Sequence, residues 1–157
     1  GMQIDLSEAI KIKGRIRIAV WNPDGSLAQE QIIDNTVCTV GKAAIANQLT
    51  AGSPSPNPLR VNYVALGTGT NAPAAGNTTL QTETFRKVTA SANNVSSVAS
   101  ITGFFTAPET SGTFREAGLF IAGTASVDTG TLLSRVAINI AKTTAQTMTI
   151  EWTITVA

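Results

Sequence analysis

The chain has 157 residues, of which 43% are hydrophobic and 13% are charged, and its 11 basic and 10 acidic residues give a net charge of +1. This length suits one domain with its own core, and the balanced charge argues against general attraction to nucleic acid or to a membrane surface. Histidine is absent and Cys38 is the only cysteine. This excludes histidine-based triads, histidine-ligated zinc, cysteine metal clusters and intrachain disulfides. We therefore expect no metal and no cofactor.

The start of the chain carries no strand or helix signal. Gly1 before Met2 is typical of a scar left by a cleaved expression tag. The residues after it have early acids and no apolar core of signal-peptide length, so we expect no secretion and no membrane anchor. We expect a single domain over residues 1–157, with a loosely ordered segment at 1–10.

Alternation indicates the first two strands. In the segment 10–20, aliphatic residues alternate with four basic ones, Lys11, Lys13, Arg15 and Arg17. A strand there has one aliphatic and one basic face. A basic ribbon can grip phosphates, but no aromatic side chains interleave to stack on bases, so we favour a strand whose charges keep it soluble. The turn residues Pro23-Asp24-Gly25 then predict a hairpin from strand 13–21 into a strand near 27–33.

A short helix is expected at about residues 40–50. Thr39 is placed to cap it, and Gly52 stands where a C-terminal glycine belongs. Cys38 lies just before this helix, where a helix N-terminus can lower the pKa of a thiol. Its small apolar neighbours favour a buried, unreactive cysteine instead.

The rest of the chain is predicted as strands and turns. The expected strands are 61–66, 86–92, 95–105, 114–121, 132–140 and 148–156. Asn93-Asn94 is the expected turn between the second and third of these, and the last strand alternates cleanly with Trp152 on its inward face. Roughly eight short strands separated by turn signals predict a mainly β fold, an antiparallel β-sandwich, with jelly-roll or immunoglobulin-like strand orders as alternatives.

The sequence Gly67-Thr68-Gly69-Thr70 follows an apolar strand and looks like a phosphate-binding loop. A dinucleotide site needs a third glycine and a helix after the loop, whereas here Ala72 takes the glycine position and Pro73 follows. A P-loop needs a lysine, and none lies between Lys42 and Lys87. We therefore interpret both glycines as structural residues of a sharp turn.

Glu116 is the carboxylate that most needs an explanation. It lies in FREAGLFIAG, a predicted strand with apolar residues on both faces, where a charge needs a partner. Arg115, Arg86 and Arg135 are the candidate partners. Our hypothesis is a structural ion pair between Glu116 and Arg135 on neighbouring strands, and a catalytic role for Glu116 is the alternative.

Several segments in a recurring order resemble a group of small structural proteins of tailed bacteriophages and prophages. The segments are DNTVCTVGKAAIANQL, ALGTGTNAP, TTLQTETFRK, GTFREAGLF, LLSRVAI with a lysine near Lys142, and TMTIEWTITV, and they span most of residues 30–157. The resemblance implies a non-enzymatic virion component that is tail- or fibre-associated. It brings no catalytic residues, and it makes Gly67, Gly69, Glu116 and Arg135 framework residues.

The composition agrees with this resemblance. A threonine-rich domain of low charge suits a subunit whose repeated copies bury apolar surface by symmetry. We therefore expect a homo-oligomer that docks on other virion proteins and assembles in a bacterial host cytoplasm, with no nucleic acid and no membrane as partners.

A carbohydrate- or surface-binding module is the second class considered. Such sites present exposed aromatic side chains for sugar stacking, and aromatic residues make up only 5% of the chain. Trp21, beside the turn, is the candidate platform. An enzyme is the third class, and the missing histidine and the failed phosphate loop argue against it.

Overall fold

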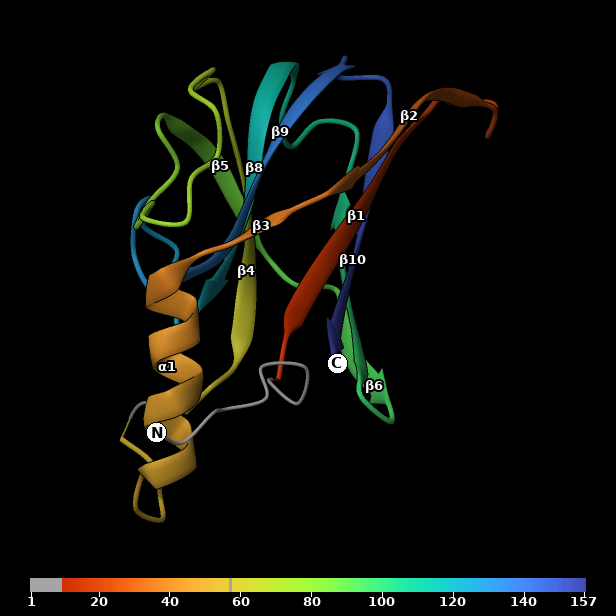
Figure 1. Ribbon diagram of the computed structural model, residues 1–157. Helices are drawn as coiled ribbons and strands as arrows, with labels where there is room; N and C mark the ends of the chain where they lie inside the picture. The colour runs from red at the N-terminus through yellow and green to blue at the C-terminus, as the bar shows by residue number, and fades with distance from the viewer. Residues whose placement is uncertain (1–9, 57) are drawn as a thin grey trace, which may run out of the picture.

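The computed structural model describes residues 10–56 and 58–157 and shows two antiparallel sheets facing each other (Figure 1). The first sheet has the strand order β2-β1-β10-β7-β6, and the second has the order β3-β9-β8-β4-β5. The elements are β1 (Ile12–Trp21), β2 (Leu27–Asp34), β3 (Thr36–Val37), α1 (Thr39–Thr50), β4 (Val61–Gly67), β5 (Glu83–Val88), β6 (Ser91–Val95), β7 (Val98–Phe105), β8 (Gly112–Ile121), β9 (Thr131–Lys142) and β10 (Thr147–Val156). The predicted antiparallel β-sandwich with one short helix is confirmed. The expectations for residues 1–9 lie outside the described residues.

The core lies between the two sheets and follows the alternation of the sequence. On β1, Ile16 and Ile18 are fully buried, and they pair with Trp152 and Ile150 of β10. Trp152 is 1% exposed, so its predicted inward orientation is confirmed. Each fully buried side chain of this kind contributes about 1.5–3 kcal/mol to folding.

The second sheet has apolar residues on both faces. On β8, Leu119 and Ile121 belong to the core between the sheets, whereas Phe120 belongs to a smaller buried cluster. Successive strand residues point to opposite faces, so this cluster lies on the outer face of the second sheet. Its buried members are Cys38, Ala65, Leu80, Phe120 and Leu132. Leu80 comes from the loop 68–82, which therefore covers this face.

The predicted turn after β1 is confirmed. Gly25 has φ +86°, a conformation that glycine adopts readily. The Asp24 carboxylate accepts hydrogen bonds from the hydroxyl of Ser26 at 2.6 Å and from its N–H at 2.9 Å. These bonds hold the pKa of Asp24 below its ordinary value.

The ends of α1 differ from the prediction. The N-cap is Cys38, which makes no side-chain capping bond. The predicted cap residue Thr39 lies inside the first turn, where its N–H donates to the carbonyl of Ala75 at 2.8 Å. The C-cap Ala51 is extended and Gly52 has no left-handed φ, so the helix ends without the predicted glycine cap. The carbonyl of Ala75 in the loop 68–82 thus satisfies one of the free N–H groups at the start of the helix.

The predicted strand 86–92 is wrong because the chain changes sheets within it. β5 belongs to the second sheet and β6 to the first. At the crossing, the N–H of Thr89 donates to Asn62 of β4 at 3.0 Å, and the N–H of Ala90 donates to Thr102 of β7 at 2.7 Å. Asn93-Asn94, predicted as a turn, lies inside β6.

Candidate functional site

The four residues singled out from the sequence meet at one place on the outer face of the second sheet. Arg135 Nε donates to Glu116 Oε1 at 3.0 Å, and the two side chains are 2% and 0% exposed. The two strands are neighbours, with Gly118 of β8 opposite Arg135 of β9. The predicted ion pair is confirmed.

The Glu116 carboxylate also accepts three backbone N–H groups. Oε2 accepts from Gly69 at 2.7 Å and from Thr82 at 2.9 Å, and Oε1 accepts from Gln81 at 2.8 Å. With Arg135, these donors occupy the roughly four acceptor positions of a carboxylate. The Gly-x-Gly loop does bind an anion, but the anion is the side chain of the protein's own Glu116.

The two glycines of this loop are required by close approach. A Cβ at Gly67 would lie 2.7 Å from Glu116 Oε2, and a Cβ at Gly69 would overlap both that oxygen and Gln81 Cβ. Any side chain here pushes the loop away from the carboxylate. The structural interpretation of both glycines follows from this packing.

The remaining donors of Arg135 bond to the middle of the same loop. Nη1 donates to Asn77 Oδ1 at 3.0 Å and to the carbonyl of Ala72 at 3.4 Å, and Nη2 donates to the carbonyl of Asn71 at 2.9 Å. Glu116 thus holds both ends of the loop 68–82, and Arg135 holds its middle. A carboxylate bonded in this way has no free lone pair with which to accept a proton from a substrate.

Arg86 forms a second buried centre that the sequence did not predict. Its Nε donates to Glu83 Oε2 at 2.7 Å, and its guanidinium carbon lies 4.5 Å from the ring centre of Phe120 and 5.4 Å from that of Tyr63. Residues three apart in a regular strand point to opposite faces, so the spacing gave no signal. A register shift at the end of β4 brings the two side chains together.

Arg86 also holds a loop. Its Nη1 donates to the carbonyls of Thr124 and Thr129 and to the Thr129 hydroxyl, each at 3.0 Å. These residues lie in the connection 122–130 between β8 and β9. Arg86 therefore has the same role for this loop that Arg135 has for the loop 68–82.

Lys142 repeats the pattern at the end of β9. It is 2% exposed, and its Nζ donates to the carbonyls of Ala107, Thr110 and Thr143 at 2.9, 2.8 and 3.2 Å. Burial lowers the pKa of Lys142, and the charge of Glu109 opposes that shift. The ammonium group holds the connection between β7 and β8.

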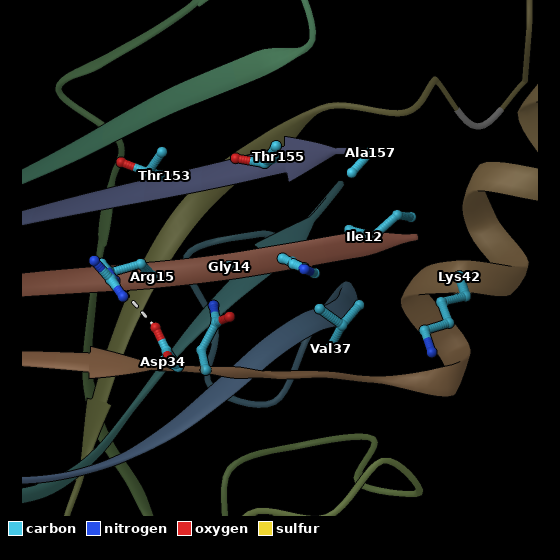
Figure 2. A pocket seen from close by; sticks show the side chains of 11 residues that line it. Ile12, Gly14, Arg15, Asp34, Val37, Lys42, Thr153, Thr155 and Ala157 are labelled. Carbon is cyan, nitrogen blue, oxygen red and sulfur yellow. Dashed lines mark hydrogen bonds and ion pairs between the residues drawn. The ribbon is translucent and has the colours of Figure 1, made fainter. Parts of the chain in front are cut away.

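A groove opens beside the start of β1, and Figure 2 shows it from close by. The pairing of β1 with β2 begins at Arg15, opposite Asp34, and the carbonyl of Gly14 accepts from the N–H of Asn35 at 3.0 Å, so Ile12 and Lys13 lie beyond the end of β2. The groove has a volume of about 870 Å³. Its lining residues are Ile12, Lys13, Gly14, Arg15, Asp34, Asn35, Val37, Lys42, Thr153, Thr155 and Ala157.

The groove has a mixed apolar and polar lining, and its charged side chains are mainly cationic. Lys13, Arg15 and Lys42 line the groove, and its one acidic side chain, Asp34, pairs with Arg15 at 3.0 Å. Asn35 donates from Nδ2 to Ser134 Oγ, whereas its buried Oδ1 has no partner among the described residues. The excess of basic side chains suits a ligand that carries an anionic group.

The tryptophan considered as a sugar platform has another contact. Trp21 is half-buried on the first sheet, and its Nε1 donates to Thr149 Oγ1 at 3.1 Å. It does not line the groove. The prediction that Trp21 is an exposed platform is therefore wrong in its exposure, because the side chain packs across β10.

Cys38 is buried, as predicted. It is 0% exposed, and its N–H donates to the carbonyl of Leu133 at 2.9 Å. Burial raises the pKa of its thiol, although the charge of Arg135 opposes that shift. A protonated, inaccessible thiol is a poor nucleophile at neutral pH.

Two further classes of site were considered across residues 10–56 and 58–157. No group of three or more metal-ligating side chains gathers there. Nothing helical in the same residues has the length and hydropathy needed to cross a bilayer. Comparison of the chain with protein-family models, with curated proteins and with solved structures finds no match.

Proposed function

We propose that the protein is a non-enzymatic structural component of a phage or prophage virion, tail- or fibre-associated, which acts by self-association and by docking to other virion proteins. The order of its motifs supports this proposal. The observation that carries it is the Glu116 centre. The loop that looks most like a catalytic or phosphate-binding element is occupied by the protein's own carboxylate.

The outer face of the first sheet also supports a docking role. Register places Thr153 and Thr155 of β10 opposite Ser100 and Val98 of β7. This part of the face carries hydroxyl and aliphatic groups rather than charges, and burying such groups costs less than burying ions. On the β1 side of β10 the same face carries charge, since Thr153 also lies opposite Arg15, which pairs with Asp34. The β7 side is therefore the neutral part of this face and the part that suits contact with another protein.

Light scattering of the purified chain over a wide range of concentrations tests self-association. We expect a mass above that of one 16.2 kDa chain, rising with concentration. A monomer at every concentration contradicts self-association. We also expect genes that encode portal, capsid or tail proteins beside the gene of this protein, and neighbours unrelated to virions contradict the virion assignment.

A carbohydrate- or surface-binding module is the second candidate, and the groove beside β1 favours it. Its basic side chains, Lys13, Arg15 and Lys42, outnumber its one acidic side chain, Asp34, and suit the carboxylates of acidic saccharides. Calorimetric titration with carboxylated and neutral oligosaccharides tests this candidate. Binding of the acidic sugar should be lost in Lys42→Ala and retained in Arg115→Ala, which changes an exposed arginine outside the groove. If neither the carboxylated nor the neutral oligosaccharide binds, this candidate function is wrong.

A further inference from the structure

Strand β6 lies outside both apolar clusters. All five of its residues, Ser91 to Val95, are exposed, and Val95 is 80% exposed. Among residues 10–56 and 58–157 it pairs only with β7, and it forms one edge of the first sheet. Figure 1 shows the hairpin at the lower right, away from β5. Alternate N–H and C=O groups of an edge strand point away from its neighbour, and those of β6 point to solvent.

β6 differs from the other edge strands of the described residues. β2 carries Glu30 and Asp34, β5 carries three charged residues, and β3 has only two residues. Charge and shortness are devices that prevent an edge from pairing with another chain. β6 has five residues with neither charge nor proline. It is therefore the edge that is open to a partner strand.

Exposed apolar side chains lie at both ends of β6. Val95 stands beside the hairpin turn, and Phe104, 41% exposed, lies on β7 just beyond the partner of Ser91. Scattered apolar residues on a surface are ordinary. Because Val95 and Phe104 flank an unprotected edge, they add apolar surface that a paired strand would cover.

We propose that β6 pairs with β6 of a second copy, antiparallel about a two-fold axis. Two five-stranded sheets then become one continuous sheet. This inference rests on the self-association proposed above and assigns its surface. A second copy presents the same neutral row of unpaired groups, so each strand satisfies the other without desolvating a charge. A strand of another virion protein is an alternative outcome of the test.

The bounds of β6 fix the register of this pair. The overlap of the strand with its own two-fold copy is longest when Asn93 lies opposite Asn93 of the second copy, with Ser91 opposite Val95. Opposed Cα atoms of antiparallel strands lie roughly 4.5–5.5 Å apart. A disulfide spans about 4.4–6.8 Å between Cα atoms. Single cysteines therefore report the register directly.

Cross-linking tests the register, with the buried Cys38 giving no background. On mild oxidation, Asn93→Cys should form a disulfide-linked dimer, whereas Ser91→Cys and Val95→Cys should each form little alone. A mixture of these last two should form the mixed dimer. The control is Val127→Cys, at a 51% exposed position far from β6 in sequence. Asn93→Cys that cross-links no faster than this control overturns the proposal.

A charged substitution tests the interface without covalent cross-linking. Asn93→Lys should raise the dimer dissociation constant by about tenfold or more, because two like charges face each other across the axis. Ala28→Lys, on the opposite edge of the same sheet, should leave it unchanged. If the wild-type chain oligomerises and Asn93→Lys has no effect, the β6 inference fails and self-association stands. A wild-type monomer that binds another virion protein through β6 assigns the edge to that protein and overturns the two-fold pair.

Discussion

The outer face of the second sheet and the β6 edge of the first both lie outside the main core, and the chain treats them in opposite ways. The outer face is covered by the loops 68–82 and 122–130, which are held by the buried Arg135 and Arg86. The five residues of β6 are all exposed and uncharged, and no described segment covers this edge. The contrast indicates that buried charge fixes the chain's own loops, while neutrality keeps an edge free for another chain.

The energetics of the two regions follow from this contrast. A buried ion is costly unless each of its hydrogen-bonding positions is filled, and the Glu116 carboxylate meets that condition with four donors. Such a centre stabilises one loop conformation strongly. Pairing of a neutral strand edge removes no charge from water, so its free-energy cost is small and the edge can pair and separate reversibly.

The largest expected effect is at the Glu116 centre. Arg135→Met should lower the free energy of unfolding by about 3–5 kcal/mol, because it leaves a buried carboxylate without its counter-charge. Denaturant unfolding measures the change. Arg115→Met is the matched control, since Arg115 is exposed on the same strand as Glu116 and should shift stability by no more than about 0.5 kcal/mol. If the two variants lower the free energy of unfolding equally, the Glu116–Arg135 pair does not stabilise the fold.

A methyl group in the same loop should have the next largest effect. Gly69→Ala should lower the free energy of unfolding by about 1–3 kcal/mol, because the new Cβ overlaps Gln81 and Glu116. Gly76→Ala is the control, since a Cβ there meets nothing within 4 Å. Thermal unfolding of the two variants gives the comparison. If Gly69→Ala and Gly76→Ala unfold at the same temperature, the loop is not packed against Gln81 and Glu116.

The edge of β9 beyond its pairing with β3 offers a second contrast with β6. β9 pairs with β3 at Arg135 and Ser134, and farther along β9 the Gln29 amide bonds both the N–H and the carbonyl of Ala141, at 3.1 and 2.6 Å. Gln29→Leu should cost about 1 kcal/mol of stability, since water can replace bonds at this exposed position. Ala28→Leu is the control. An unfolding midpoint that is unchanged in Gln29→Leu would mean that the side chain does not seal this edge.

The smallest expected effect depends on pH. The hydrogen bond from Lys87 holds the pKa of Glu109 below its ordinary value of 4.5. A lowered pKa in the folded state contributes stability that is present above about 4.5 and is lost as the pH falls through the folded value. Glu109→Gln should therefore lose less stability than the wild type on acidification below 4.5. If the two proteins lose the same amount of stability on acidification, this account is contradicted.

The sequence predicted the features that depend on local pattern. Alternation along β10 placed Trp152 in the core, and the apolar surroundings of Glu116 called for the partner that Arg135 supplies. The crossing at 89–90 and the Arg86 centre were not predictable. Both depend on pairings between distant strands, and a run of six to seven strand-forming residues does not show where it changes sheets.

The strand nature of β6 was hidden for a related reason. Asn93-Asn94 has turn propensity, yet the hairpin turn falls at Ser96, with φ 51°. Pairing with β7 overrides the local preference. The strand character of β6 therefore depends on its pairing with β7 and not on its own residues alone.

Amide hydrogen exchange at low and high protein concentration tests the contrast between the two regions most directly. The amides of Gly69, Gln81 and Thr82, which bond Glu116, should exchange slowly at both concentrations. The outward amides of β6 should exchange rapidly at low concentration and become protected at high concentration. Exchange in β6 that is independent of concentration, or rapid exchange at the Glu116 centre, would contradict the account.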